Sequence, residues 1–213
     1  MKKALSFLFL VVLFTSCTNV GKPKADYDIS LNDLTTSDDL FGWPGAIYGS
    51  SVTETEKALN ITFPETPFFS EEWLDSEAKV FRDYRNITDY DFVEFASYKG
   101  GNPVLVKYGD SYGNMTCEFN KGKLSVVMVY FTNGAMPRDK KLNSGNYDNN
   151  LEKLYSQLQD DSKSIWGEPD YIIDQPDYPL ESRWDKKDTR YYATYDTRGE
   201  TDYVRIAIQQ INS

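Results

Sequence analysis

The chain has 213 residues, 40% hydrophobic and 26% charged, which excludes a disordered, collagen-like or multi-spanning membrane protein and predicts one domain or two small repeats. A formal net charge of −10 at pH 7 repels a phosphate backbone, so nucleic acid is an unfavourable partner. The absence of histidine excludes Ser-His-Asp and Cys-His catalysis, the usual zinc sites and imidazole proton shuttles.

The N-terminus has the pattern of a secretory leader. Two lysines precede an apolar run at 4–14 that is too short to span a bilayer, and Thr15, Ser16 and Cys17 follow it. This ending resembles the lipobox of bacterial lipoproteins, here of the Bacteroidota type. The resemblance implies a signal peptide at 1–16 and a lipid on Cys17, which anchors the chain to the outer membrane of the cell envelope, facing the periplasm. The alternative is an ordinary signal peptide with an incidental cysteine.

The mature chain divides into a tether and a domain. Residues 17–30 hold few apolar side chains and predict a flexible tether, so a single domain is expected over 31–213, with candidate halves at 41–132 and 146–213. Ser51 and Glu54 form a capping-box pattern before an apolar stretch, which predicts a helix over 51–59 closed by Asn60. The pattern at 70–84 also allows a helix.

Alternation of apolar and polar residues predicts the first strands. The four segments 92–98, 103–108, 115–119 and 124–131 are separated by Gly-rich or Asn-rich turns. Cys117 falls on the apolar side of its segment, which favours a packing role over a reactive thiol.

The second half repeats the order of helix and strands. Apolar residues recur at helical spacing from Leu151 to Trp166, and Gly167 and Pro169 end that helix. Strands are predicted at 171–174, 182–185, 189–197 and 202–211. Because the turns are too short for parallel crossovers, we expect an α+β fold in which helices pack on one face of an antiparallel sheet, with two helix-then-strands repeats as an option.

Two short segments carry a further resemblance. The run from Gly49 through Ser51 and Glu54 to Leu59, and the ending Trp166-Gly167-Glu168-Pro169, resemble the repeats of small envelope lipoproteins such as the outer-membrane assembly component BamE. The β-lactamase inhibitor protein has a similar layout of helix and strands. The resemblance implies a protein-binding module whose open sheet face is the contact surface.

The patterns that could carry catalysis are short. Ser76 and Lys79 match the Ser-x-x-Lys spacing of penicillin-recognising enzymes, but neither Ser-Asp-Asn nor Lys-Thr-Gly occurs in the chain. Acidic residues near turns, such as Asp89, Asp91 and Glu168, allow carboxylate chemistry in principle, although turn acids usually cap or are solvated. Neither a calcium loop nor a phosphate-binding loop is present. We therefore expect no enzyme activity, no cofactor and no metal.

Aromatic and Arg side chains are expected on strand positions that leave the core face, where they would contact a partner. These residues are Trp184, Arg190, Tyr192, Tyr203 and Arg205. The alternative is that tyrosine is simply common in sheets, since the chain contains 16 of them. The sequence thus predicts a membrane-anchored, non-enzymatic module that binds another envelope protein. A glycan- or small-ligand-binding lipoprotein is the alternative, and a carboxylate-dependent hydrolase is the third hypothesis.

Overall fold

The computed structural model describes residues 24–35, 41–68, 92–99, 102–133, 149–199 and 201–211. The helical elements are the 3-10 helix η1 (Leu31–Leu34) and the α-helices α1 (Val52–Leu59) and α3 (Leu151–Trp166). The strands are β1 (Tyr27–Ile29), β2 (Phe92–Ala96), β3 (Tyr98–Lys99), β4 (Asn102–Pro103), β5 (Leu105–Tyr108), β6 (Ser111–Asn120), β7 (Lys123–Thr132), β8 (Tyr171–Ile173), β9 (Leu180–Lys186), β10 (Thr189–Asp196) and β11 (Tyr203–Gln210). The expected helix at 70–84 lies outside the described residues.

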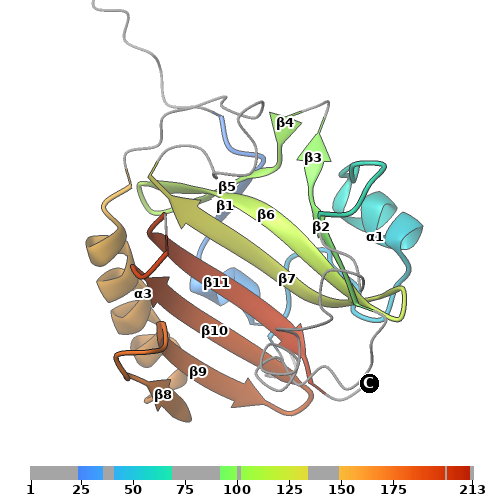
Figure 1. Cartoon of the computed structure of the whole chain (residues 1–213). Coiled ribbons are helices and arrows are strands. Elements are labelled where there is room, and N and C mark those ends of the chain that lie inside the picture. The colour runs from blue at the N-terminus through green and yellow to red at the C-terminus, as the bar shows by residue number, and fades with distance from the viewer. Residues whose placement is uncertain are drawn as a thin grey trace, which may run out of the picture.

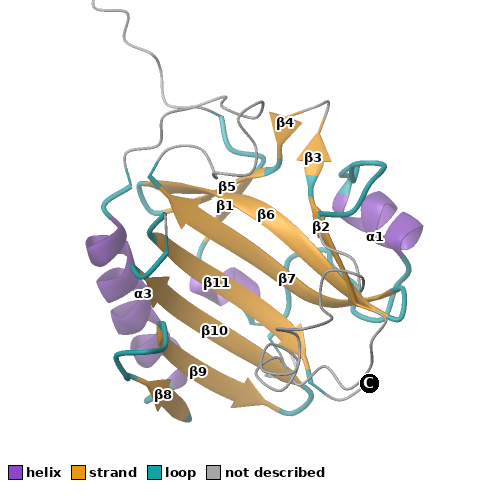
Figure 2. Cartoon of the chain, in the orientation of Figure 1, coloured by secondary structure: helices purple, strands orange, loops and turns teal. Residues whose placement is uncertain are grey.

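A nine-stranded, mostly antiparallel sheet dominates the fold (Figure 1). Its strands follow the order β1-β5-β6-β7-β11-β10-β9-β8, and β2 pairs with the far end of β6. The small pair of β3 and β4 forms a separate two-stranded sheet. Strands from both halves of the sequence share the large sheet because β7 pairs with β11. The α+β class is thus present in a form with far more sheet than helix, as Figure 2 shows.

Strand β1 differs from two expectations. Tyr27–Ile29 were expected in the tether, but they pair with Val106–Tyr108 of β5. The pair is parallel, so the expectation of an antiparallel sheet throughout is wrong at this edge. The long connection between β1 and β5 explains the difference, since a parallel neighbour needs a long crossover and not a hairpin. The sheet therefore begins before residue 31, where the domain was expected to start.

Helix α1 confirms the predicted capping box. Ser51 Oγ accepts from the backbone N–H of Glu54, and the Glu54 carboxylate in turn accepts from the Ser51 backbone N–H at 2.8 Å. Asn60 ends the helix in the left-handed conformation, with φ 52°, which Asn tolerates better than most residues. These local bonds satisfy the free N–H groups of the first turn.

Helix α3 begins at an Asn cap and, as predicted, ends at a glycine. Asn150 Oδ1 accepts from the backbone N–H of Lys153 at 3.0 Å, and Gly167 follows the last turn. The neighbouring Asn149 is buried, and its side-chain amide bonds the backbone of Tyr112 and Thr132 at the ends of β6 and β7. The start of α3 is thus fixed to the sheet. Among the described residues, no helix combines the length and apolar character needed to cross a bilayer.

The main core combines side chains from the sheet with apolar residues of η1, α1 and α3. Leu59 of α1 and Leu154 and Leu158 of α3 are buried in the same cluster as Val129 and Ile206 of the sheet. Cys117 is also in this cluster and fully buried, as the alternation in β6 predicted. Burial raises the pKa of its thiol to about 12, so the sulfur stays protonated at neutral pH.

Candidate functional site

The residues that alternate with the main core along β7, β9, β10 and β11 form a second face of the sheet. Four of the five predicted partner-binding residues, Arg190, Tyr192, Tyr203 and Arg205, lie on this face. The face is not open, however, because Tyr192 and Arg205 are only 5% and 6% exposed. It contains its own apolar cluster of Val126, Met128, Tyr192 and Ala207.

Trp184 lies on the opposite side from its expected position. It pairs with Tyr191 across the β9–β10 hairpin, and its ring lies 5.6 Å from the Tyr191 ring and 6.1 Å from that of Trp166. Its Nε1–H donates to the Gly167 carbonyl at 3.0 Å, and the residue is 1% exposed. The expectation that Trp184 leaves the core face is therefore wrong. The sequence contained the information needed for the correct placement. A hairpin turn of even length between β9 and β10 makes residues 184 and 191 direct cross-strand partners, and such partners lie on the same face of a sheet.

A hydrogen-bonded row crosses the second face on three neighbouring strands. Arg205 of β11 donates from Nη2 to Thr194 Oγ1 at 3.1 Å and lies 3.4 Å from Glu181 Oε2. Thr194 Oγ1 in turn donates to the same Glu181 oxygen at 3.0 Å. The charges are buried but paired, which avoids the large cost of an isolated buried charge. This row joins β9, β10 and β11 on the side away from the main core.

The other predicted residues on this face also bond within the chain. Tyr192 donates from its hydroxyl to Gln209 Oε1 at 2.6 Å. Arg190 makes a two-point contact with Asp185, from Nε at 2.6 Å and from Nη2 at 2.9 Å. Tyr203 is half-buried; burial raises the pKa of its phenol to about 12. These contacts explain the residue types by folding alone, and the partner-binding role stays a prediction.

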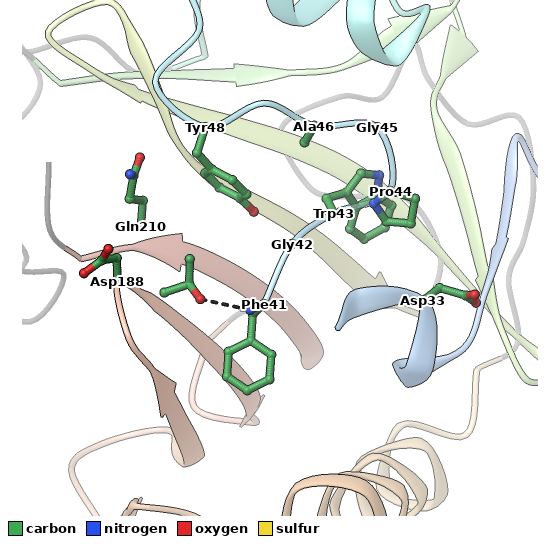
Figure 3. A pocket seen from close by; sticks show the side chains of 11 residues that line it. Asp33, Phe41, Gly42, Trp43, Pro44, Gly45, Ala46, Tyr48, Asp188 and Gln210 are labelled. Carbon is green, nitrogen blue, oxygen red and sulfur yellow. Dashed lines mark hydrogen bonds between the residues drawn. The ribbon is translucent and has the colours of Figure 1, made fainter. Parts of the chain in front are cut away.

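A cavity of about 380 Å³ lies between the segment 41–48, η1 and the ends of β10 and β11 (Figure 3). It was not predicted from the sequence. Its lining includes the aromatic residues Phe41, Trp43 and Tyr48, with Asp188 and Gln210 at the sheet end. Trp43 is buried, and no described residue accepts a hydrogen bond from its indole Nε1–H. A lining that mixes aromatic rings with polar groups is typical of small-ligand sites.

Most of the large exposed apolar side chains of the described residues belong to one short stretch of the chain, residues 165–178, which we call the β8 corner. Five large apolar side chains are exposed in the described part of the chain, and Ile165, Tyr171, Ile172 and Tyr178 are four of them. They come from the C-terminal turn of α3, from β8 and from the turn that follows it, which lie together at the outer edge of the sheet in Figure 1. Clustered exposed apolar groups mark interaction surfaces more often than scattered ones do.

Sequence reasoning placed a strand at 171–174 but missed its exposure. The run Tyr-Ile-Ile is as apolar as a buried strand, so composition favours the interior. Only the strand order shows that β8 ends the sheet.

Comparison of the chain with protein-family models, with curated proteins and with solved structures finds no match. Within the described ranges, no three or more Cys, Asp or Glu side chains are grouped so that they could hold a metal ion. The geometry of the described residues therefore carries the functional argument by itself.

Proposed function

We propose that this chain is a non-enzymatic protein-binding module of the bacterial cell envelope. The observation that carries the proposal is the β8 corner, where four of the five exposed large apolar side chains of the described residues lie within fourteen positions of sequence. Tyr171 and Tyr178 are of a type that often dominates interface energetics, because their rings bury large areas at a small entropic cost.

The packing of the second face of the sheet supports the β8 corner as the proposed contact surface. In the proposed module the helices cover one face, and the lipid on Cys17 holds the domain at the outer membrane, on the periplasmic side. The sequence resemblance of 49–59 and 166–169 to BamE-like lipoprotein repeats also favours protein binding. The contact surface we propose is the β8 corner, where the side chains are accessible, and not the second face, where Tyr192 and Arg205 are buried.

The test is site-specific cross-linking in the native envelope. A photo-reactive amino acid at position 172, in the β8 corner, should capture one defined protein, which mass spectrometry identifies. The matched control is position 47, because Ile47 is the one exposed large apolar residue of the described set outside the corner. Capture that does not differ between the two positions, or no protein captured at any surface position, contradicts the proposal.

Anchoring is tested separately with Cys17→Ala. We expect the wild-type chain to sediment with membranes and its mature N-terminal peptide to carry lipid. The variant should lose the lipid modification. An unmodified cysteine in the wild-type mature chain contradicts the lipoprotein part of the proposal and leaves the binding part standing.

The cavity supports a second candidate function, the binding of a glycan or another small ligand. Its volume of about 380 Å³ is at the low end of ligand sites, and aromatic rings and hydrogen-bonding groups line it together. This function is tested by titrating the chain with a panel of neutral oligosaccharides while tryptophan fluorescence is monitored. Binding that Tyr48→Ala abolishes, and that Ile172→Ala leaves unchanged, would favour this function over the first.

A further inference from the structure

The outer edge of β8 offers backbone groups as well as side chains. In the described part of the chain, β8 is the last strand of the sheet. One of its edges pairs with β9, and no described strand pairs with the other edge. Figure 2 shows it at the rim of the molecule, next to the end of α3. An edge strand presents a row of N–H and C=O groups that can accept an added strand.

We propose that the β8 edge binds an extended, basic segment of the partner protein, which adds a strand to the sheet. This inference rests on the proposed function and names the kind of partner. Charge complementarity selects a basic segment, because residues 165–178 include Glu168, Asp170, Asp174 and Asp177 and no Lys or Arg. Lys163 pairs with Glu168 at 3.2 Å and Arg183 lies over the Tyr171 ring, so the negative charge that a partner meets comes chiefly from the three aspartates. All four acidic residues are exposed. Complementary charge at an interface speeds encounter and rejects partners of like charge.

Side chains on both faces of β8 fit an added strand. Successive residues of a strand point to opposite faces, so Tyr171 and Ile172 are presented on different sides of the same edge. Their exposed fractions are 48% and 55%. The Arg183 guanidinium lies 4.5 Å from the centroid of the Tyr171 ring and holds this ring in place from the neighbouring strand β9. An incoming strand with alternating residues would contact Tyr171 with one set and Ile172 with the other.

Two prolines set the length of the contact. Pro169 and Pro176 lie on either side of β8, and proline has no N–H to donate to a neighbouring strand. Pairing is therefore confined to 170–175, which is enough for a short strand. A short edge also protects the protein from uncontrolled sheet extension.

The same charges disfavour a second copy of the chain as the occupant. Edge-to-edge pairing of two copies would bring four acidic residues against four others of the same sign. Like charges placed opposite each other in a sheet are destabilising. The occupant is thus a partner of opposite charge, and self-association is an outcome that the experiment must exclude.

The test uses the purified full chain and fluorescence anisotropy. The probe is a short labelled peptide of alternating lysine and valine. One comparison peptide has glutamate in place of lysine, and the other has the original side chains with every backbone amide N-methylated. We expect only the first peptide to bind, because the second is repelled and the third has no backbone N–H to donate and carries methyl groups that obstruct strand pairing. Equal binding by the N-methylated peptide would overturn strand pairing, and equal binding by the glutamate peptide would overturn the charge argument.

Variants place the binding on the structure. Ile172→Ala combined with Tyr171→Ala should weaken peptide binding by about tenfold or more, as expected for residues at the centre of an interface. The matched control Ile47→Ala should stay within about twofold, since surface substitutions elsewhere rarely matter. Asp174→Asn should weaken binding and flatten its salt dependence, whereas Asp202→Asn, an exposed acid near the β10–β11 turn, should do neither. Equal effects of target and control variants would overturn the assignment.

Sedimentation of the chain alone and the envelope cross-linking separate the remaining outcomes. A dimer that Ile172→Ala abolishes would overturn the basic partner and establish a second copy as the occupant. A defined protein captured away from residues 165–178 would overturn the strand-pairing inference and leave protein binding standing. No captured protein from any position would remove the proposed function itself.

Discussion

Replacing Trp184 with alanine should destabilise the fold by about 3–5 kcal/mol, the usual cost of truncating a fully buried tryptophan. The indole is 1% exposed and lies against the rings of Trp166 and Tyr191. Truncation leaves a cavity among these rings and removes the Nε1 hydrogen bond to Gly167. Since a domain of this kind is stable by about 5–15 kcal/mol, the loss is a large fraction of the total.

Urea unfolding followed by circular dichroism measures this loss. Trp184→Phe keeps a ring but lacks the N–H, so it should lower the free energy of unfolding less than Trp184→Ala does. The missing hydrogen bond accounts for about 0.5–1.5 kcal/mol of the loss in the phenylalanine variant. Tyr171→Ala is the control, because Tyr171 is half-exposed and its ring lies against the Arg183 guanidinium at the edge of the sheet. We expect it to lose no more than about 1 kcal/mol.

The decisive measurement is the urea concentration at the midpoint of unfolding of the Trp184→Ala variant. A midpoint equal to that of the parent chain, together with weaker capture of a partner, would place the indole on a binding surface. That outcome would refute the burial argument and restore the original prediction for Trp184.

Three further predictions test other parts of the fold. Gly113→Ala should cost about 1–3 kcal/mol or more in urea unfolding, because its Cβ would lie 2.6 Å from Val129 Cγ1 and 2.8 Å from a backbone oxygen; Gly199→Ala, with no atom nearer than 3.8 Å, should be nearly neutral, and equal effects would contradict the packing. Cys117 should resist alkylation in the native chain at pH 8 and react once guanidinium unfolds it, since burial raises its pKa to about 12; rapid native labelling would show an accessible thiol. The Arg198 guanidinium lowers the pKa of Asp196, so this carboxylate stabilises the fold above its unfolded pKa of about 3.9 and the contribution is lost as pH falls through the folded value. The difference in free energy of unfolding between Asp196→Asn and the parent chain should therefore become smaller at acid pH. A difference that stays constant from pH 7 to 3 would contradict this linkage.

Local chemistry made much of the secondary structure predictable. The capping box at Ser51, the left-handed Asn60 and the Gly167 stop act within one helical turn, so the sequence pattern was sufficient for α1 and α3. Alternation in β6 and β11 also assigned faces correctly, including the burial of Cys117, because neighbouring strand residues always point to opposite sides.

Long-range pairing decided what local patterns could not. In the described part of the chain, strand β1 joins the sheet through β5, some eighty residues away, and no nearby sequence signal marks Tyr27–Ile29 as a strand. The second face looked open from the sequence, but burial depends on what covers a face, and Tyr192 and Arg205 are buried. The position of β8 at the rim is likewise a property of the strand order.

The sequence by itself determined the residue types, the acidic balance, the helix ends and the alternation of each strand, because these depend on neighbours within a few positions. The tertiary structure decided which apolar residues stay accessible. Ile172 is exposed although its strand β8 is apolar, and Trp184 is buried although its strand β9 is mostly polar. The reason is that Ile172 lies at the edge of the sheet, whereas Trp184 lies opposite Tyr191, which packs against Trp166 of α3. Exposure is set by the whole arrangement of strands, and for this reason the candidate contact surface could be found only in the folded chain.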